Sequence, residues 1–357
     1  MNNSDYMKFI GTTDMSLVDV MEQIDNNAGG ILFVINSDKE LVGCITDGDI
    51  RRWLIGTGNL RANVTEVMNK NPLYIFDYES AKAKSLMCSK RITAIPVIND
   101  KKQIIEILFA NSFSESNSKP ISDLSEIPVV IMAGGKGTRL YPYTRILPKP
   151  LIPIGETPIV ERIIDKFTEY NISKFFITVN YRKSMIRSYF SELDPDYNLV
   201  FVEEDKPLGT GGSITLIKEE FTQPVFVTNC DTLILADYGD IYDYHKKSAN
   251  DITIVSSVKN ITVPYGTIIS SANGKISALE EKPKLSYLIN TGMYIVNPET
   301  LKLIPKDTFF HMTHLVEKVL AQGGNVGMYP ISEESFLDMG EIKEMNRMKS
   351  RLNIKDE

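Results

Sequence analysis

Residues 127–155 read IPVVIMAGGKGTRLYPYTRILPKPLIPIG, so an apolar run passes directly into a glycine-rich segment and then into Pro-Lys-Pro. Glycines that follow a strand let main-chain N–H groups approach a phosphate closely and point at it. Two common phosphate loops are excluded by single residues. A P-loop needs Ser or Thr after its lysine, but Gly137 follows Lys136. A dinucleotide fingerprint that starts at Gly135 has Leu140 in place of its third glycine.

Beyond this loop, apolar strand-like runs alternate with helical patterns, as in PIVERIIDKFTEY, KFFITVN, KSMIRSYFSEL, LVFVEE and PVFVTNCD. This alternation predicts an α/β fold, a doubly wound and mostly parallel sheet with helices on both faces, over residues 127–357. Ligands of such sheets bind at the carboxyl ends of the strands. Asp231 follows the run PVFVTNC and is therefore expected at that edge.

The combination GGxGTR and, ten residues on, PKP resembles the signature of the sugar-1-phosphate nucleotidyltransferases, whose domain has a Rossmann-like fold. The resemblance covers about residues 128–345. It implies that Arg139, Lys149 and Asp231 are catalytic and that the loop binds the nucleoside triphosphate. The expected contacts of the loop are Ala133, Gly134, Gly135, Gly137, Thr138 and Arg139.

The same resemblance assigns the sequence LGTGG, residues 208–212, to the turn that contacts the nucleobase. Expected base contacts are Leu208, Gly209, Thr210, Gly211 and the preceding Glu204. Guanine presents its N1–H and N2 amino group side by side, and one carboxylate can accept from both. Uracil and thymine instead flank a single N–H with carbonyls, so the acidic run at 203–205 favours guanine.

Sugar-phosphate contacts follow from further matches to that family. The expected residues are Tyr265, Gly266, Glu281, Lys282, Asn290 and Gly292. Two carboxylates, Asp231 and Asp338 in FLDMGE, are expected to hold Mg²⁺, which needs few protein ligands when phosphate oxygens and water complete its shell. The usual family segment continues D-x-G-T, whereas Glu341 follows Gly340 here.

Before the loop lies a weak internal repeat, in which Val34-Ile35-Asn36 aligns with Val97-Ile98-Asn99. Each copy predicts a helix, a strand, a turn and a second strand. The pair resembles a tandem of CBS domains (a Bateman module), at residues 6–60 and 62–112 within 1–112. The resemblance implies that Thr46 and Asp49 of GCITDGD hold a nucleotide, because the matching residues of that family do so. The second copy has Phe109 in place of Thr46. The Ser- and Asn-rich residues 113–126 are expected to be the linker.

A CBS pair before this catalytic domain is similar to the glucosamine-1-phosphate guanylyltransferases of legionaminic acid synthesis. The resemblance implies that GTP and a hexosamine 1-phosphate give a GDP-sugar and pyrophosphate. Mannose- or heptose-1-phosphate guanylyltransferases and uridylyl- or cytidylyltransferases stay open as alternatives. A different class, a nucleotide sensor with an inactive transferase domain, also stays open. CBS pairs commonly associate, so a homodimer or larger assembly is expected.

Composition excludes several other classes. The formal net charge is −7 and the basic residues are dispersed, which disfavours nucleic acid and anionic membranes as partners. No targeting segment is recognisable, and the three distant cysteines are expected to be reduced thiols of a cytoplasmic protein. His311 and His314 have no third metal ligand nearby, and His245 is expected on a helix surface.

Overall fold

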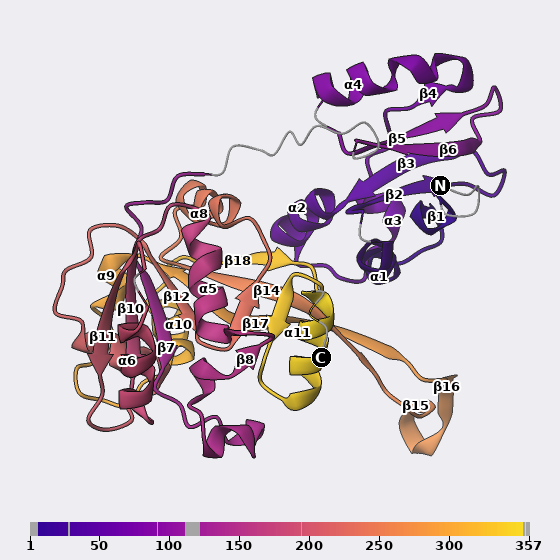
Figure 1. The fold of residues 1–357 in the computed structure, drawn as a ribbon. Coiled ribbons are helices and arrows are strands. Elements are labelled where there is room, and N and C mark those ends of the chain that lie inside the picture. Colours follow the sequence, from indigo (N-terminus) through magenta and orange to yellow (C-terminus); the bar gives the residue numbers. More distant parts are fainter. Residues whose placement is uncertain are drawn as a thin grey trace. The chain divides into compact units, whose positions relative to one another are not determined.

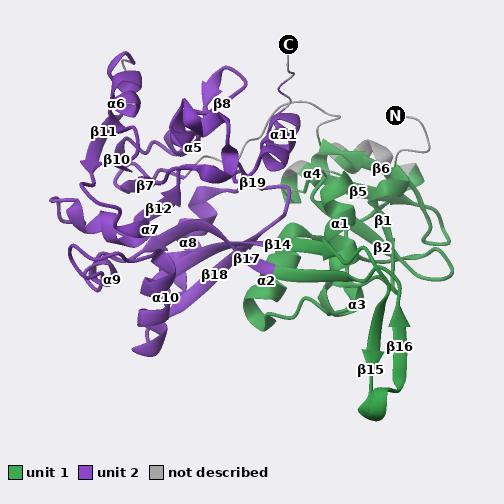
Figure 2. Ribbon diagram, turned by 90° about the horizontal axis from the view of Figure 1, so that it is seen from below, with its two compact units in different colours: residues 1–119, 258–287 green, residues 120–257, 288–357 purple. Residues whose placement is uncertain are grey.

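The computed structural model describes residues 6–27, 29–90, 92–110, 122–193, 195–352 and 354. These residues form two units, coloured separately in Figure 2. Unit 1 comprises residues 1–119 and 258–287, and unit 2 comprises residues 120–257 and 288–357. The segment 258–287 therefore groups with the N-terminal part of the chain, whereas the sequence places it in the transferase domain at 127–357.

A seven-stranded sheet forms the centre of unit 2, in the order β11-β10-β7-β12-β17-β14-β18 (Figure 1). Its strands are β7 (Val129–Ala133), β10 (Lys174–Val179), β11 (Asn198–Glu203), β12 (Val225–Asn229), β14 (Ile252–Thr262), β17 (Lys284–Val296) and β18 (Val326–Ile331). The pairs β10–β11, β7–β10, β7–β12 and β14–β18 are parallel, and β12–β17 is antiparallel. The α/β fold with a mostly parallel sheet is thus confirmed.

Side chains of β7 alternate between two hydrophobic cores, one on each face of this sheet. Val129 and Ile131 join one core, and Val130 and Met132 join the other. All four are buried, because a strand with helices on both faces has no solvent-facing side.

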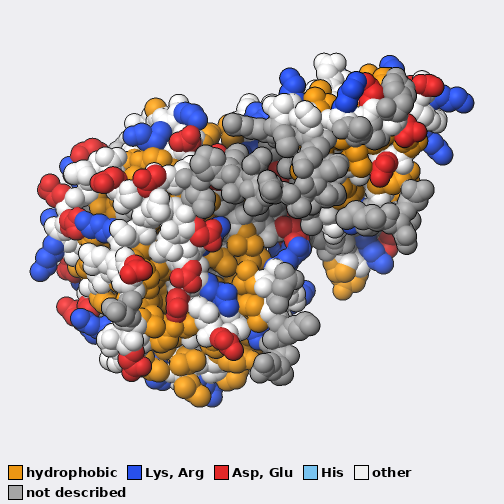
Figure 3. Space-filling model, turned by 45° about the horizontal axis from the view of Figure 1, so that its top comes forward, with side chains coloured by type: hydrophobic (Ala, Val, Ile, Leu, Met, Phe, Trp, Pro, Cys, Tyr) orange, Lys and Arg blue, Asp and Glu red, His pale blue; other side chains and the backbone are white. Residues whose placement is uncertain are grey.

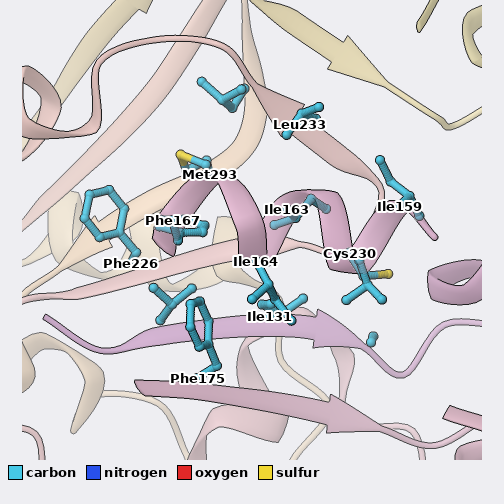
Figure 4. Close-up of a cluster of buried hydrophobic side chains, with 14 of the residues drawn as sticks. Ile131, Ile159, Ile163, Ile164, Phe167, Phe175, Phe226, Cys230, Leu233 and Met293 are labelled. Carbon is cyan, nitrogen blue, oxygen red and sulfur yellow. The ribbon is translucent and has the colours of Figure 1, made fainter. Parts of the chain in front are cut away.

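Helices cover both faces of the sheet. One core includes residues from α5 (Ile159–Thr168), α6 (Lys183–Ser191), α8 (Tyr238–Lys247) and α11 (Ile342–Arg351). Figure 4 shows Ile163, Ile164 and Phe167 of α5 among apolar side chains from the sheet strands. The opposite core receives residues from η7 (Ser213–Leu216), α9 (Pro298–Leu301) and α10 (Met312–Ala321).

Short elements connect these layers. They are η4 (Thr138–Leu140), η5 (Tyr143–Arg145), η6 (Lys149–Leu151), β8 (Pro153–Ile154), β9 (Thr157–Pro158), α7 (Gly209–Gly212), β13 (Thr232–Ile234) and β19 (Phe336–Asp338). Residues 113–121 of the expected linker lie outside the described residues. Leu124, in the last part of that expected linker, is buried in a core of unit 2, and its N–H donates to the carbonyl of Tyr170 at 2.9 Å.

Unit 1 contains the internal repeat. Its first copy comprises η1 (Tyr6–Phe9), β1 (Ile10–Thr12), α1 (Leu17–Asn27), β2 (Ile31–Ile35), β3 (Leu41–Thr46), α2 (Asp47–Thr57) and α3 (Val64–Val67). The second comprises β4 (Ile75–Phe76), η2 (Asp77–Lys82), α4 (Ala83–Lys90), β5 (Ala94–Ile98) and β6 (Ile104–Phe109). In each copy the first two strands pair in parallel and the last two antiparallel.

The turns of the two copies have the same hydrogen bonds. The side-chain oxygen of Asn36 accepts from the N–H groups of Asp38 and Glu40. The side-chain oxygen of Asn99 accepts likewise from Lys101 and Gln103. One hydrophobic core takes residues from both copies, so neither three-stranded sheet leaves its apolar face open.

The strands β14 and β17 extend into unit 1 and are joined by a hairpin. This hairpin consists of β15 (Thr267–Ser270), η8 (Ala272–Gly274) and β16 (Ile276–Glu280). Within the described part of the chain, its two strands pair only with each other.

The expectation for His245 was wrong, because this residue of α8 is buried. Its Nδ1 lies 2.9 Å from the hydroxyl of Thr253 and its Nε2 lies 3.1 Å from the side-chain oxygen of Asn297. The sequence DYHKKS is polar on both sides of the histidine, which is typical of a helix surface. The local pattern therefore does not reveal that Thr253 and Asn297 contact the two ring nitrogens.

The described surface has no large area of one charge on the face shown in Figure 3, where acidic and basic side chains intermingle. In the part of the chain that the structure describes, none of the helices combines the length and the hydropathy that a membrane-spanning segment needs.

Candidate active site

The glycine-rich loop expected to bind phosphate leaves the central strand β7 and has its tightest point at Gly137. This residue has a φ of +64°, and a Cβ there would lie 2.9 Å from Thr144 Cγ2 and 3.1 Å from Lys149 Cβ. The Thr144 hydroxyl also donates to the Gly137 carbonyl at 2.8 Å. Only glycine meets both the backbone and the space requirement, so the loop packs directly against Lys149.

Lys149 and Asp231 form an ion pair within unit 2. Lys149 begins η6, and Asp231 follows the carboxyl end of β12. Only 12% of the lysine side chain and 10% of the aspartate side chain are exposed, so solvent screens this pair little. The arrangement holds an ammonium group directly beside a carboxylate at the edge of the sheet.

Asp338 lies beside Asp231 because the short strand β19 pairs with β13. Thr232 is the register partner of Asp338, and the N–H of Met339 donates to the Asp231 carbonyl at 2.9 Å. The pKa of Asp338 is raised to about 6, chiefly by burial and also by the negative charge of Asp231, although the positive charges of Lys149 and Arg139 oppose the rise. Two carboxylates therefore share a partly desolvated site.

A pocket of about 270 Å³ opens at these carboxylates. Expected site residues supply half of its lining. The lining consists of Met132, Arg139, Thr210, Asn229, Asp231, Thr232, Asn290, Thr291, Gly292, Tyr294, Phe336 and Asp338. The fold thus brings together the loop arginine, both aspartates and residues of the segments expected to contact the base and the sugar.

The turn at 208–212 is supported by the chain before α10. The N–H groups of Gly211 and Gly212 donate to the carbonyl of Phe310 at 2.8 and 2.9 Å. Gly209 has a φ of +77°, and a Cβ there would lie 2.7 Å from the same carbonyl. These glycines therefore serve close backbone packing, and the N–H groups of Gly211 and Gly212 are already bonded within the protein.

Glu204 is buried next to the phosphate loop. Its Oε2 accepts a hydrogen bond from the N–H of Leu208 at 3.0 Å. Its Oε1 lies so close to the loop that a Cβ added at Gly134 would be only 2.4 Å from it. Burial raises the pKa of Glu204, and the bond from Leu208 opposes the rise. Each carboxylate oxygen has two lone pairs, so Glu204 keeps acceptor capacity beside the loop.

The expected sugar-phosphate residues divide between the two units. Asn290 and Gly292 line the pocket in unit 2. Tyr265, Gly266, Glu281 and Lys282 lie in residues 258–287 of unit 1. Within that segment, a Cβ at Gly266 would lie 2.8 Å from Glu281 Oε2, so these two residues are neighbours.

Thr46 and Asp49, expected at a nucleotide site of unit 1, form the N-terminal cap of α2. The Thr46 hydroxyl donates to Asp49 Oδ2 at 2.7 Å, and Arg52 donates to Asp49 Oδ1 at 2.6 Å. The structure thus gives both residues a local role in starting the helix.

The sequence did not reveal the supporting role of His311. Its Nδ1 lies 3.3 Å from the Thr210 hydroxyl, and that hydroxyl accepts the N–H of Met312 at 3.1 Å. Asn229 was also missed, although its position two residues before Asp231 at the end of β12 is a usable signal. His311 has no comparable signal because its contact spans 101 residues.

The donor set at the pocket fits a hard divalent cation. Asp231 and Asp338 provide carboxylate oxygens from adjacent strand ends, and their mutual repulsion favours a cation between them. Among the described residues there is no cluster of three or more His, Cys, Asp or Glu that could form a closed metal cage. Two carboxylates with open space beside them suit a metal that also binds phosphate oxygens and water.

Comparison with known families decides the classification. The family model described as "Nucleotidyl transferase" matches residues 128–353. The chain belongs to the nucleotidyl transferase family. A second model, "CBS domain", matches residues 12–56, which correspond to the first copy of the repeat. The nucleotidyl transferase match contains the glycine-rich loop, both aspartates and every residue that lines the pocket.

Curated relatives include mannose-1-phosphate guanyltransferases. The one from Debaryomyces hansenii is 33% identical over 185 residues, which are 49% of this chain and 51% of the relative. "Mannose-1-phosphate guanyltransferase 2" from Candida glabrata is 30% identical over 225 residues, 60% of this chain and 62% of the relative. The chain therefore spans about half the length of the first of these relatives and less than two thirds of the second.

A solved structure supports the fold of the nucleotidyl transferase part. It is a candidate glucose-1-phosphate thymidylyltransferase from Bacillus anthracis, crystallised with sucrose. It is 20% identical, has a TM-score of 0.50, and the match covers 65% of this chain and 97% of that chain. At this identity the similarity concerns the fold alone.

Proposed function

We propose that the protein is a sugar-1-phosphate guanylyltransferase. The observation that carries the proposal is the convergence of Arg139, Lys149, Asp231 and Asp338 at one pocket beside a glycine-rich loop. An oxygen of the sugar 1-phosphate attacks the α-phosphorus of GTP, a new P–O bond forms, and the bond to the leaving pyrophosphate breaks. Because the attacking phosphate is already an anion, the reaction needs no nucleophile from the protein.

The protein is then required to position the two reacting phosphates and to neutralise their negative charge with positive side chains. Arg139 offsets charge on the leaving pyrophosphate as a guanidinium fork. Lys149 holds the transferred α-phosphate, and Lys282 holds the phosphate of the sugar. The loop glycines Gly134, Gly135 and Gly137, with Ala133 and Thr138, present main-chain groups to the triphosphate.

Asp231 and Asp338 are the residues that we propose for Mg²⁺. When bound, the ion supplies neutralisation of the phosphate charge. The two carboxylates would hold the ion at the strand ends, where Lys149 is already paired with Asp231.

Guanine as the base rests on Glu204 and the 208–212 turn. Glu204 is an acceptor at the junction of the loop and the turn, where adjacent N1–H and N2 donors would find it. The names of the curated guanyltransferase relatives support the same base. Uracil and cytosine, the bases of a uridylyl or cytidylyl transfer, do not present such a pair of adjacent donors.

For the sugar, two candidates have separate support. Glucosamine 1-phosphate or another hexosamine 1-phosphate follows from the CBS-first arrangement, within the synthesis of legionaminic acid or another surface glycan. Mannose 1-phosphate follows from the names of the relatives and fits equally well. Tyr265, Gly266, Glu281, Asn290 and Gly292 are the proposed sugar contacts. The described free thiols, Cys44 and Cys230, agree with a cytoplasmic enzyme.

A pyrophosphate-release assay tests the proposal. The purified protein is incubated with Mg²⁺, each of four nucleoside triphosphates and a panel of mannose, heptose, glucosamine and N-acetylated hexosamine 1-phosphates. We expect release with GTP and one of these sugars. Release with UTP or CTP alone would show that the base is uracil or cytosine and not guanine. No release with any pair would instead support a nucleotide sensor, and calorimetry with adenine and guanine nucleotides, in wild type and Thr46→Ala, would then test the site at Thr46 and Asp49.

A further inference from the structure

Three residues from neighbouring strands of unit 2 form a row along the pocket. Met132 of β7 is the register partner of Asn229 of β12. Thr228 pairs with Met293 of β17, so the next antiparallel pair is Asn229 and Gly292. Met132, Asn229 and Gly292 all line the pocket. Asn229 is therefore the polar side chain in the middle of this row.

The strand pattern gives no structural reason for an amide at this position. Val225 and Val227 of β12 are buried in the core on one face of the sheet. Alternate residues of a strand point to the same face, so Asn229 continues this apolar series. A polar group on such a face loses hydration unless another hydrogen-bond partner replaces the water.

The pocket contains two asparagine side chains that differ in their hydrogen bonds. Asn290 donates from Nδ2 to the hydroxyl of Tyr294 at 2.7 Å and accepts the N–H of Gly292 at 2.9 Å. No residue that the structure describes forms a hydrogen bond with the amide of Asn229. Its side-chain oxygen and both of its N–H groups are thus open to a ligand.

Gly292 leaves the space that this amide occupies. The φ of Gly292 is +84°, and a Cβ there would lie 2.3 Å from Asn229 Nδ2 and 2.9 Å from Asn229 Cγ. Any other residue at 292 would strain the backbone and displace the amide. The fold therefore accommodates an amide that has no partner of its own at the edge of the pocket.

We propose that Asn229 binds a hydroxyl group of the sugar and contributes to the selection of the sugar. A hydroxyl donates to the amide oxygen and accepts from the amide N–H, so it complements both groups. A phosphate oxygen only accepts, and a protonated amine such as that of glucosamine only donates, so each complements only one of them.

The position of Asn229 favours the sugar over the nucleobase. Its neighbour Gly292 belongs to the segment proposed to contact the sugar, whereas Glu204 and the turn at 208–212 are proposed to contact guanine. Asn229 also precedes Asp231, at which the reacting phosphates are proposed to bind, by two residues. This role of Asn229 rests on the proposed sugar-1-phosphate transferase function.

Turnover with sugars that lack one hydroxyl tests this role. The substrates are mannose 1-phosphate, glucosamine 1-phosphate and analogues of each without a single hydroxyl. In wild type, we expect one analogue to lose about tenfold in kcat/KM, as for one lost hydrogen bond. Asn229→Ala is expected to lose about the same factor with the complete sugar and nothing further with that analogue, because the same bond is removed only once. The KM for GTP is expected to stay unchanged.

A second variant separates hydrogen bonding from packing. Asn229→Leu keeps a branched side chain of similar shape but has no donor or acceptor. We expect the same loss as in Asn229→Ala, whereas a residue needed only for packing would lose activity in the alanine variant alone. Asn346→Ala is the control, because Asn346 is an exposed asparagine of α11, and it is expected to keep wild-type kcat/KM. Urea unfolding shows whether each variant is folded.

The outcomes distinguish this role from the proposed function. If wild type releases pyrophosphate and Asn229→Leu keeps wild-type kcat/KM, or if Asn229→Ala loses a further tenfold with every analogue that is impaired in wild type, the role of Asn229 is overturned and the function stands. If wild type releases no pyrophosphate, the function fails, and calorimetry with mannose and glucosamine 1-phosphates then tests Asn229. About tenfold weaker binding to Asn229→Leu than to wild type supports the role, whereas equal binding or no binding to wild type overturns it.

Discussion

The ammonium group of Lys149 is paired with the carboxylate of Asp231, although 82 residues separate them in sequence. The pair forms because the loop after β7 folds back over the end of the neighbouring strand β12. The pair places a positive side chain next to a carboxylate that we also propose as a metal ligand.

Lys149→Gln is expected to lower the turnover of pyrophosphate release by two or more orders of magnitude while the protein stays folded. Glutamine keeps most of the chain volume but removes the positive charge that meets the transferred phosphate. Steady-state turnover with saturating substrates measures the effect. The control is Lys302→Gln, an exposed residue paired with Glu299 at 2.6 Å on the other side of the sheet. Wild-type turnover in Lys149→Gln would refute the assigned role.

Asp231→Asn and Asp338→Asn are each expected to shift the Mg²⁺ dependence of turnover to at least about tenfold higher concentration. Each substitution removes one of two anionic ligands that a hard cation requires. Turnover as a function of Mg²⁺ concentration gives the shift. Asp243→Asn, an exposed position on α8, serves as the control. If both pocket variants kept the wild-type Mg²⁺ curve, these aspartates would not hold the metal.

Gly137→Ala is expected to destabilise the protein by about 1–3 kcal/mol, whereas Gly135→Ala is expected not to. At Gly137 the φ is +64° and a Cβ meets Thr144 and Lys149, while at Gly135 nothing lies within 4 Å of a Cβ. Urea unfolding of both variants measures the difference. Gly135→Ala is expected instead to raise the KM for GTP, because the methyl group enters the space of the phosphates. Equal stability of the two variants would contradict the loop geometry.

Stability is expected to fall with pH below about 6.5 because of His245. Burial lowers the pKa of this imidazole from its ordinary value of 6.5, an effect that the bond to Asn297 partly opposes. In acid the unfolded chain binds a proton that the folded protein excludes, so the free energy of unfolding decreases as pH falls. One such group contributes at most about 1.4 kcal/mol per pH unit.

Urea unfolding between pH 5 and pH 8 measures that dependence in wild type and in His245→Gln. The variant is expected to be less stable at pH 8, since it loses the paired ring, and to show a flatter pH dependence below 6.5. An unchanged slope in the variant would mean that other groups cause the acid sensitivity.

Much of the transferase part could be predicted from local patterns. The alternation of apolar runs and helical periods predicts the sheet because each buried strand must be apolar on both faces, as Val129 to Met132 are. The position of Asp231 at a strand end follows from the same pattern. In unit 1 the repeated Asn36 and Asn99 turns are equally local, since each asparagine bonds its own following residues.

Other features depend on contacts between distant residues. The pairing of β13 with β19 brings Asp338 to Asp231, and the carbonyl of Phe310 supports the glycines at 209–212. His245 has an ordinary helix-surface sequence context, yet its ring is buried and its two nitrogens contact Thr253 and Asn297. Residues 258–287 have the sequence of a sugar-site segment, but they group with unit 1.

The amino-acid sequence alone therefore determined the fold class, the glycine-rich loop after β7 and the strand-end aspartate, because these follow from periodicity and from residues adjacent in the chain. The tertiary structure alone decided which carboxylates share the pocket and which residues support the turn at 208–212. Those properties arise when strands far apart in sequence pair in register, and no local pattern encodes that register.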